Sequence, residues 1–152
     1  MAKRRPSRPD PVAEWRARLT AAVARADAII REHADAAMVL AIEDDGNEGY
    51  DTFIGGCGHP VQIQGLMLAA CDYYAREESI VVDETDDLRA QAVSKSCAEI
   101  GGLAEHGLIA VPAVSDGTSV YVQHWGSELV VTEAVRRMDE LLSKPKPKRR
   151  RN

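Results

Sequence analysis

Apolar residues recur at helical spacing in two long stretches of the first half of the chain. In the first stretch, Asp10 is predicted to be the N-cap and Pro11 the first helical residue, and the pattern continues for about 25 residues. A helix this long and rich in alanine needs a partner surface, so we expect it to pack as a core element, with Trp15 on its apolar face. The second stretch opens at Pro60, continues to about Glu78, and has an apolar face formed by Ile63, Leu66, Met67, Ala70, Cys71 and Tyr74.

Two further helices are predicted in the second half. Residues 85–87 have the capping residue and first-turn acids of a helix start, and Gly107 is predicted to end this third helix as its C′ residue. Gly101 and Gly102 weaken the pattern, because a glycine in a helix costs about 1 kcal/mol relative to alanine. The last helix should end before Lys144, and its predicted inward residues are Val131, Ala134, Val135, Met138, Leu141 and Leu142.

Short apolar runs between these helices predict two β-hairpins. Residues 38–42 and 50–54 flank an acidic, glycine-containing turn, and residues 108–114 and 119–124 flank an Asp-Gly turn. Pro112 should place its strand at a sheet edge or end it. No internal repeat is visible in the sequence. The pattern predicts a single compact α+β domain, with about four helices and two hairpins, whose mixed or antiparallel sheet is packed by the first and last helices.

Basic residues are concentrated at the two ends of the chain. Residues 1–9 contain four basic and no acidic residues, and residues 144–152 contain six basic and no acidic residues. The domain between them, residues 10–143, holds all 24 acids and nine bases, so its net charge is −15 although the whole chain has −5. We predict that both tails are disordered and contact nucleic acid, while residues 146–151 would direct nuclear import in a eukaryotic cell. The alternative is that the tails only keep the protein soluble. The residues predicted to make this contact are Lys3, Arg4, Arg5, Arg8, Lys146, Lys148, Arg149, Arg150 and Arg151.

A glycine-rich loop lies between a predicted strand and the helix opened by Pro60. Backbone N–H groups and a helix dipole at such a junction can hold a phosphate or a carboxylate. The predicted ligand-binding or anion-binding residues are therefore Gly55, Gly56, Cys57, Gly58 and His59. The alternative is a tight turn in which one or more glycines need a positive φ. Cys57 likewise has two interpretations, an activated thiolate near His59 or a partly buried small residue.

The cysteines and the apolar runs indicate the compartment. Cys57, Cys71 and Cys97 leave an odd thiol in any disulfide scheme, which favours a reducing environment. Together with His59 they lack the two close ligand pairs of a zinc site, so we expect no metal and no cofactor. The apolar runs are far shorter than the ~18 residues of a membrane span. The expected location is the cytoplasm, or the nucleus if the source is eukaryotic, with no membrane partner.

Residues 88–124 follow the order helix, Gly-Leu-Ile, strand, turn and strand. The residues of this motif are Leu103, Gly107, Leu108 and Ile109. The order resembles the recognition helix and wing of a winged-helix DNA-binding domain, and it implies a wing at residues 110–123. The segment departs from the positive surface that such a domain presents to phosphates, because Glu99 and Glu105 accompany Lys95.

A second resemblance rests on Ile54-Gly55-Gly56, Pro60 and the Ala- and Leu-rich residues 66–70. This order is similar to that of small, mostly uncharacterised accessory proteins of phages that infect high-GC actinobacteria. It implies a genomic context without a reaction.

The two resemblances and the charge segregation favour a non-enzymatic accessory or regulatory protein that binds another macromolecule. The expected partner is another protein or a second copy of the chain in a homodimer, with nucleic acid at the basic tails. Two alternatives stay open. One is a winged-helix-like DNA-binding regulator, and the other is a small-ligand or phosphate-binding domain, or an enzyme, that uses loop 55–60.

Overall fold

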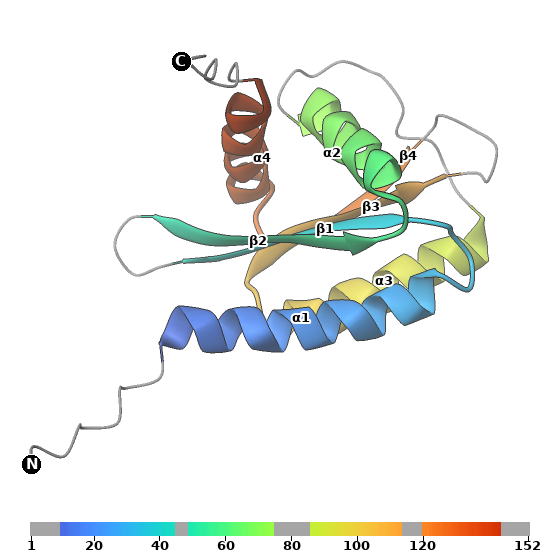
Figure 1. Cartoon of the computed structure of the whole chain (residues 1–152), viewed down its shortest axis with the longest axis horizontal. Helices are drawn as coiled ribbons and strands as arrows, with labels where there is room; N and C mark the ends of the chain where they lie inside the picture. The colour runs from blue at the N-terminus through green and yellow to red at the C-terminus, as the bar shows by residue number, and fades with distance from the viewer. Residues whose placement is uncertain (1–9, 45–48, 75–85, 114–119, 144–152) are drawn as a thin grey trace, which may run out of the picture.

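A four-stranded antiparallel sheet lies between two pairs of helices in the computed structural model (Figure 1), which describes residues 10–44, 49–74, 86–113 and 120–143. The predicted α+β class is confirmed, with four helices and two antiparallel hairpins in these residues. In chain order the elements are α1 (Pro11–Ile30), β1 (Ala37–Asp44), β2 (Tyr50–Cys57), α2 (Pro60–Tyr74), α3 (Asp87–Gly101), β3 (His106–Pro112), β4 (Val120–Trp125) and α4 (Glu128–Ser143).

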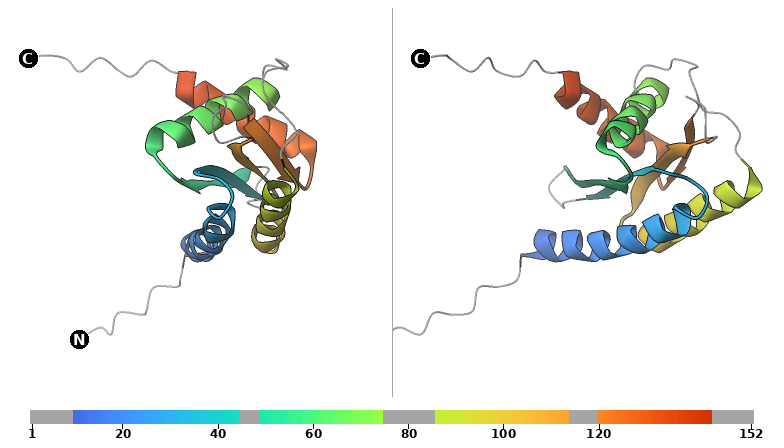
Figure 2. Two further views of the ribbon diagram at one scale, coloured as in Figure 1. Left: turned by 90° about the vertical axis from the view of Figure 1, so that its right-hand side faces the viewer. Right: turned by 45° about the vertical axis from the view of Figure 1, so that its right-hand side comes forward.

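The sheet separates two hydrophobic cores. Its strand order is β2-β1-β3-β4, so β1 and β3 are central while β2 and β4 form the edges. α1 and α3 cover one face, and α2 and α4 cover the other (Figures 1 and 2). Successive side chains of β1 point to opposite faces, so Val39 and Ala41 pack against α1 and α3, whereas Leu40 and Ile42 pack against α2 and α4. A strand buried on both faces is apolar at successive positions, which explains the run at 38–42.

α1 is a core element, as predicted. Its N-cap is Asp10, whose carboxylate accepts a hydrogen bond of 3.0 Å from the backbone N–H of Val12. Trp15 is half-buried, and its indole N–H donates 2.8 Å to the carbonyl of Leu103 beyond the end of α3. The helix is therefore tied along its length to α3 and to the sheet.

The structure contains an internal repeat, in which an α-β-β-α unit occurs twice about a pseudo-two-fold axis at the Val39–Ile109 pair. Equivalent residues of α1 and α3, and of β1 and β3, are 70 positions apart in the sequence. Moving each residue to its equivalent turns the paired residues Met38 and Ala110 into the paired residues Leu108 and Leu40. All five buried residues of α1 have a buried counterpart in α3. The equivalent pairs are Leu19 and Arg89, Ala22 and Ala92, Val23 and Val93, Ala26 and Ser96, and Ile30 and Ile100.

The repeat continues beyond each hairpin with a shift of 68 positions. Gly58 and Gly126 lie two residues before α2 and α4, and both have positive φ, 103° and 78° respectively. A Cβ at Gly58 would meet Ala36, and a Cβ at Gly126 would meet its equivalent, His106. The sequence does not display the repeat, because equivalent positions share burial and backbone geometry without sharing side-chain type.

Several predicted boundaries are wrong, each for a reason visible in the packing. α1 ends at Ile30, since the chain must turn there to enter β1. α3 ends at Gly101, so Gly107 is not its C′ residue but lies in β3, where a Cβ would meet the Leu40 carbonyl and the Trp125 ring. The prediction for Pro112 is confirmed in one of its two forms, because Pro112 ends β3. It does not place β3 at an edge, since β3 is a central strand whose pairing with β1 stops at Ala110.

The described part of the β3–β4 hairpin is built into the sheet. β3 pairs with both β1 and β4, and its residues 107–111 are buried. α3 packs on the sheet beside α1, with the hydroxyl of Ser96 3.4 Å from the carbonyl of Ala26. The helix–strand–strand order of residues 88–124 therefore builds half of the sheet in the described residues, and residues 114–119 of the expected wing lie outside them.

Candidate functional site: a groove between β2 and α4

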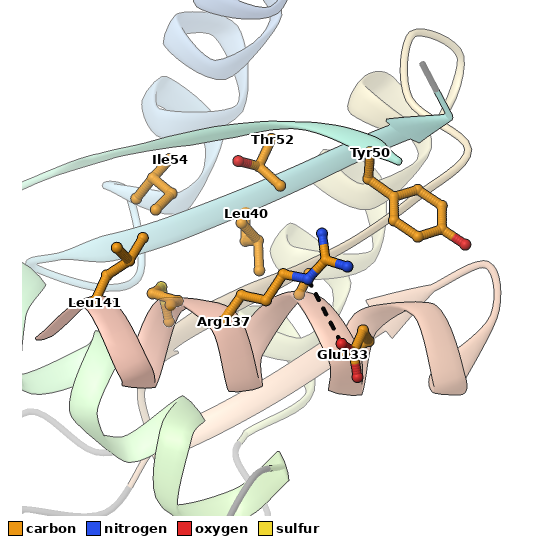
Figure 3. A pocket seen from close by; sticks show the side chains of 9 residues that line it. Leu40, Tyr50, Thr52, Ile54, Glu133, Arg137 and Leu141 are labelled. Atoms are coloured by element: carbon orange, nitrogen blue, oxygen red, sulfur yellow. Dashed lines mark ion pairs between the residues drawn. The ribbon is translucent and has the colours of Figure 1, made fainter. Parts of the chain in front are cut away.

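A groove of about 180 Å³ opens between the edge strand β2 and α4 (Figure 3). In the view of Figure 3, Tyr50 and Glu133 lie toward one end of the groove, and Ile54 and Leu141 lie toward the other. Side chains on the central strand and on both walls line it: Leu40, Tyr50, Thr52, Ile54, Glu133, Ala134, Arg137, Met138 and Leu141. The lining is apolar at the base and polar at the rim.

Helical periodicity brings five of these residues onto one side of α4. Ala134, Met138 and Leu141 follow each other at spacings of four and three, which places them on one face of the helix. Ala134 and Met138 are buried, but Leu141 is 68% exposed. Leu141 and Leu142 were predicted to face inward, and this is wrong, because the sheet does not reach under the last turn of α4.

Charges at the rim are paired. Glu133 lies 3.5 Å from the guanidinium of Arg137 across the groove side of α4, and 3.5 Å from that of Arg136 on its other oxygen. Exposed pairs of this kind contribute little to stability, about 0–1 kcal/mol each. The one carboxylate and two guanidinium groups of these pairs sum to a charge of +1 at the mouth of the groove, while the domain around it is strongly acidic.

The wall formed by β2 is also an unpaired sheet edge. The backbone carbonyl of Thr52 accepts a 3.1 Å hydrogen bond from Arg16 of α1, so this carbonyl points away from β1. Backbone and side-chain directions both alternate with period two along a strand. The outward backbone groups therefore belong to Tyr50, Thr52 and Ile54, the same residues whose side chains line the groove.

The second repeat covers the equivalent surface. Thr52 and Ile54 of β2 correspond to Val120 and Val122 of β4, and these valines pack into the core beneath α2. Thr52 is exposed and Ile54 is 45% exposed, whereas Val120 is only 6% exposed. On α2 the half-buried Ala69 stands where α4 has the long side chain of Arg137. The groove is thus a local departure from the internal symmetry.

The predicted glycine loop is shorter than expected, because β2 extends to Cys57. Gly55 and Gly56 therefore lie in a strand, where a Cβ at Gly56 would meet the carbonyl of Ala37 on β1. Gly58 supplies the positive φ that ends β2. These close approaches give the glycines a structural role, as the tight-turn interpretation proposed, and anion binding by residues 55–59 stays a prediction.

Cys57 and His59 do not act on each other. His59 Nδ1 accepts a hydrogen bond of 3.1 Å from the backbone N–H of Val61 at the start of α2. Burial raises the pKa of the Cys57 thiol to about 11, with a further increase from the charge of Asp27 and from the hydrogen bond to it. The pKa of Asp27 is raised as well, chiefly by burial. An activated thiolate would need the opposite shift, so the thiol is the partly buried small residue of the second interpretation.

The two remaining cysteines are not brought together. Cys71 is buried under α2 and Cys97 under α3, on opposite faces of the sheet. The described residues contain no cluster of three or more His, Cys, Asp or Glu side chains that could hold a metal ion. Among the helices of the described residues, none is long and apolar enough to cross a membrane. The basic residues of both tails lie outside the described ranges.

Sequence reasoning missed the groove and one buried charge. Arg89 is 5% exposed, although it is the equivalent of Leu19, and nothing in the local pattern distinguishes it from a surface arginine of α3. The exposure of Leu141 follows from the position of the sheet, which the sequence does not specify. No alternation marked Ile54 as a half-covered strand position either, because the apolar Phe53 and Ile54 are adjacent in residues 50–54.

Comparisons of the chain with protein-family models, with curated proteins and with solved structures found no match.

Proposed function

We propose that this chain is a non-enzymatic accessory protein that acts by binding another macromolecule, and that the groove between β2 and α4 receives apolar side chains of a protein partner. The observation that supports this most is the exposure of Ile54 and Leu141, both of which line the groove, while Val122, the equivalent of Ile54 in the other copy of the repeat, is half-buried. Sites for drug-sized ligands measure about 300–1,000 Å³. A groove of about 180 Å³ suits one or two side chains of a macromolecule better.

A matched pair of leucines on α4 tests this proposal. Leu141 is 68% exposed and lines the groove, whereas Leu129 is 83% exposed on the same helix and does not line it. Both substitutions to lysine should leave the melting temperature nearly unchanged, because neither removes buried surface. In cross-linked affinity purification from the native cell, Leu141→Lys should reduce the dominant partner at least about tenfold, while Leu129→Lys retains it. Equal recovery with both variants would exclude the groove as the binding surface.

The basic tails support a second contact, with nucleic acid. Their charges of +4 and +6 adjoin a domain of net charge −15, and clustered lysine and arginine bind phosphates with a strong dependence on salt. Deleting residues 1–9 and 144–152 should abolish a salt-sensitive mobility shift of DNA or RNA without lowering the melting temperature. A truncated protein that binds as tightly as the full chain would contradict this part of the proposal. Nuclease treatment during the purification separates the two contacts.

A further inference from the structure

We infer that β2 is a docking edge, to which an extended basic segment of a partner protein adds as a fifth antiparallel or parallel strand with its apolar side chains in the groove. The inference rests on the proposed function and specifies the partner's chemistry. Three features of the described residues carry it: the free backbone edge, the position of the groove, and the charge on the opposite face of the strand.

The edge presents backbone groups that can pair. β2 ends the sheet on one side, and its ladder to β1 uses the inward groups of alternate residues. The outward carbonyl of Thr52 already accepts a hydrogen bond, from the exposed guanidinium of Arg16. Sheet edges in native proteins are commonly blocked against pairing. Here the block is one long, flexible side chain, which an incoming strand can displace.

The groove accounts for the partner's apolar side chains. In an added strand, side chains alternate between the two faces of the sheet. Those on the α4 side would lie beside Thr52 and Ile54 and reach the exposed Leu141 across the groove. The backbone contact and the side-chain contact therefore use the same three residues of β2, Tyr50, Thr52 and Ile54.

The opposite face accounts for the partner's charge. Phe53 packs against the core of α1 and α3, so Asp51 lies on that same face of the strand, directly paired with Glu43 of β1. Alternate residues of an added strand would lie beside Asp51, at the edge of a domain with net charge −15. Basic residues are favoured there. A second copy of the domain carries the same net charge of −15, which disfavours a homodimer through β2.

The test uses a probe peptide with the full-length protein. The probe is an acetylated and amidated peptide as long as β2, eight residues, in which leucine and lysine alternate. Two further peptides carry N-methyl groups on all leucines or on all lysines. In a paired strand only alternate N–H groups face the sheet, so one methylated peptide should bind at least about tenfold more weakly and the other within about twofold of the parent. Whether methylation of the leucines or of the lysines weakens binding shows whether the added strand is antiparallel or parallel to β2.

Variants of the protein complete the test. Thr52→Pro removes an outward N–H and should therefore weaken peptide binding about tenfold. The variant should still fold, because proline is tolerated in edge strands. Arg16→Ala removes the competing guanidinium and should tighten binding about twofold or more. Backbone N–H signals of Tyr50, Thr52 and Ile54 should shift in NMR spectra on titration. Sedimentation of the free protein measures whether it forms a dimer. A dimer that Thr52→Pro dissociates would mean that a second copy of the chain occupies the edge, and it would overturn the inference.

The outcomes separate this inference from the proposed function. Failure of the unmodified peptide to bind, or equal effects of both methylation patterns, overturns strand addition. If Ile54→Lys weakens peptide binding while both methylated peptides bind like the parent, the groove binds side chains without strand addition, and only the proposed function stands. If Ile54→Lys and Leu141→Lys both leave peptide binding unchanged, the groove is not the site and both proposals fail.

Discussion

Arg89 offers the sharpest test of how this fold is held together. Its side chain is 5% exposed in α3, and its guanidinium donates three hydrogen bonds to backbone carbonyls. Nε and Nη2 both reach the carbonyl of His33, at 3.0 and 2.7 Å, and Nη1 reaches the carbonyl of Pro112 at 2.7 Å. The side chain thus ties the turn after α1 and the end of β3 to α3. Asp86, its acidic neighbour, is 3.9 Å away and exposed, and contributes little.

The geometry sets the expected loss of stability. Hydrogen bonds to charged groups contribute about 1.5–3 kcal/mol each, and a buried carbonyl left without a donor costs about 1–3 kcal/mol. These values are not additive, so Arg89→Ala should lower the free energy of unfolding by about 3–5 kcal/mol. Arg89→Lys keeps a charge but loses the planar fork on His33, and should cost about 1–3 kcal/mol. A domain of this size has about 5–15 kcal/mol in total.

Urea unfolding at neutral pH measures these losses. Arg25→Ala is the matched control, because Arg25 lies 58% exposed on α1 and pairs with Glu99 at 3.5 Å. Removing an exposed pair should cost less than about 1 kcal/mol. Arg89→Met retains the apolar stem, so it distinguishes lost packing from lost hydrogen bonds. If Arg89→Ala is no more destabilising than Arg25→Ala, the three contacts do not hold the elements together and the reasoning is refuted.

Two further predictions concern the glycines and Cys57. Gly58→Ala and Gly126→Ala should each lower the free energy of unfolding by at least about 1–2 kcal/mol, because both positions need positive φ and lack room for a Cβ. Gly65 has open space around it in α2, so Gly65→Ala should raise the free energy of unfolding by up to about 1 kcal/mol in the same urea assay. The Cys57 thiol should react with iodoacetamide far more slowly than a cysteine peptide at about pH 8.5, and Asp27→Asn should speed the reaction, because it removes a charge that raises the thiol pKa. Rapid labelling of the unmodified chain would show that the thiol is ionised.

Local patterns predicted the elements well, because capping and periodicity act within a few residues. Asp10 and Asp86 cap α1 and α3 through their carboxylates, and Pro60 opens α2. The turns and ends were harder to predict, since they depend on contacts between elements distant in sequence. Gly107 looked like a helix terminator but is a strand residue, because its neighbours Leu40 and Trp125 leave no room for a side chain.

The candidate site could not be predicted in the same way. A groove is defined by where a helix ends relative to a sheet, and α4 has the same apolar spacing at the buried Met138 as at the exposed Leu141. The glycine segment attracted attention because its composition is unusual. Its glycines instead allow β2 to approach Ala36 and the carbonyl of Ala37 closely. The unusual composition of the glycine segment thus reflects close backbone approaches, whereas the residues that line the groove have an ordinary composition that gave no indication of it.

The internal repeat explains why the groove can exist without loss of the fold. In the layer of α1 and α3, the two helices meet near the axis at an equivalent pair, Ala26 and Ser96, so a change in one copy is felt by the other. The layer of α2 and α4 is less constrained. There α2 packs across β1, β3 and β4, while the matching approach of α4 to β1 and β2 stays open. Since two cores flank the sheet, the core under α1 and α3 can supply stability while Ile54 and Leu141 stay uncovered on the opposite face.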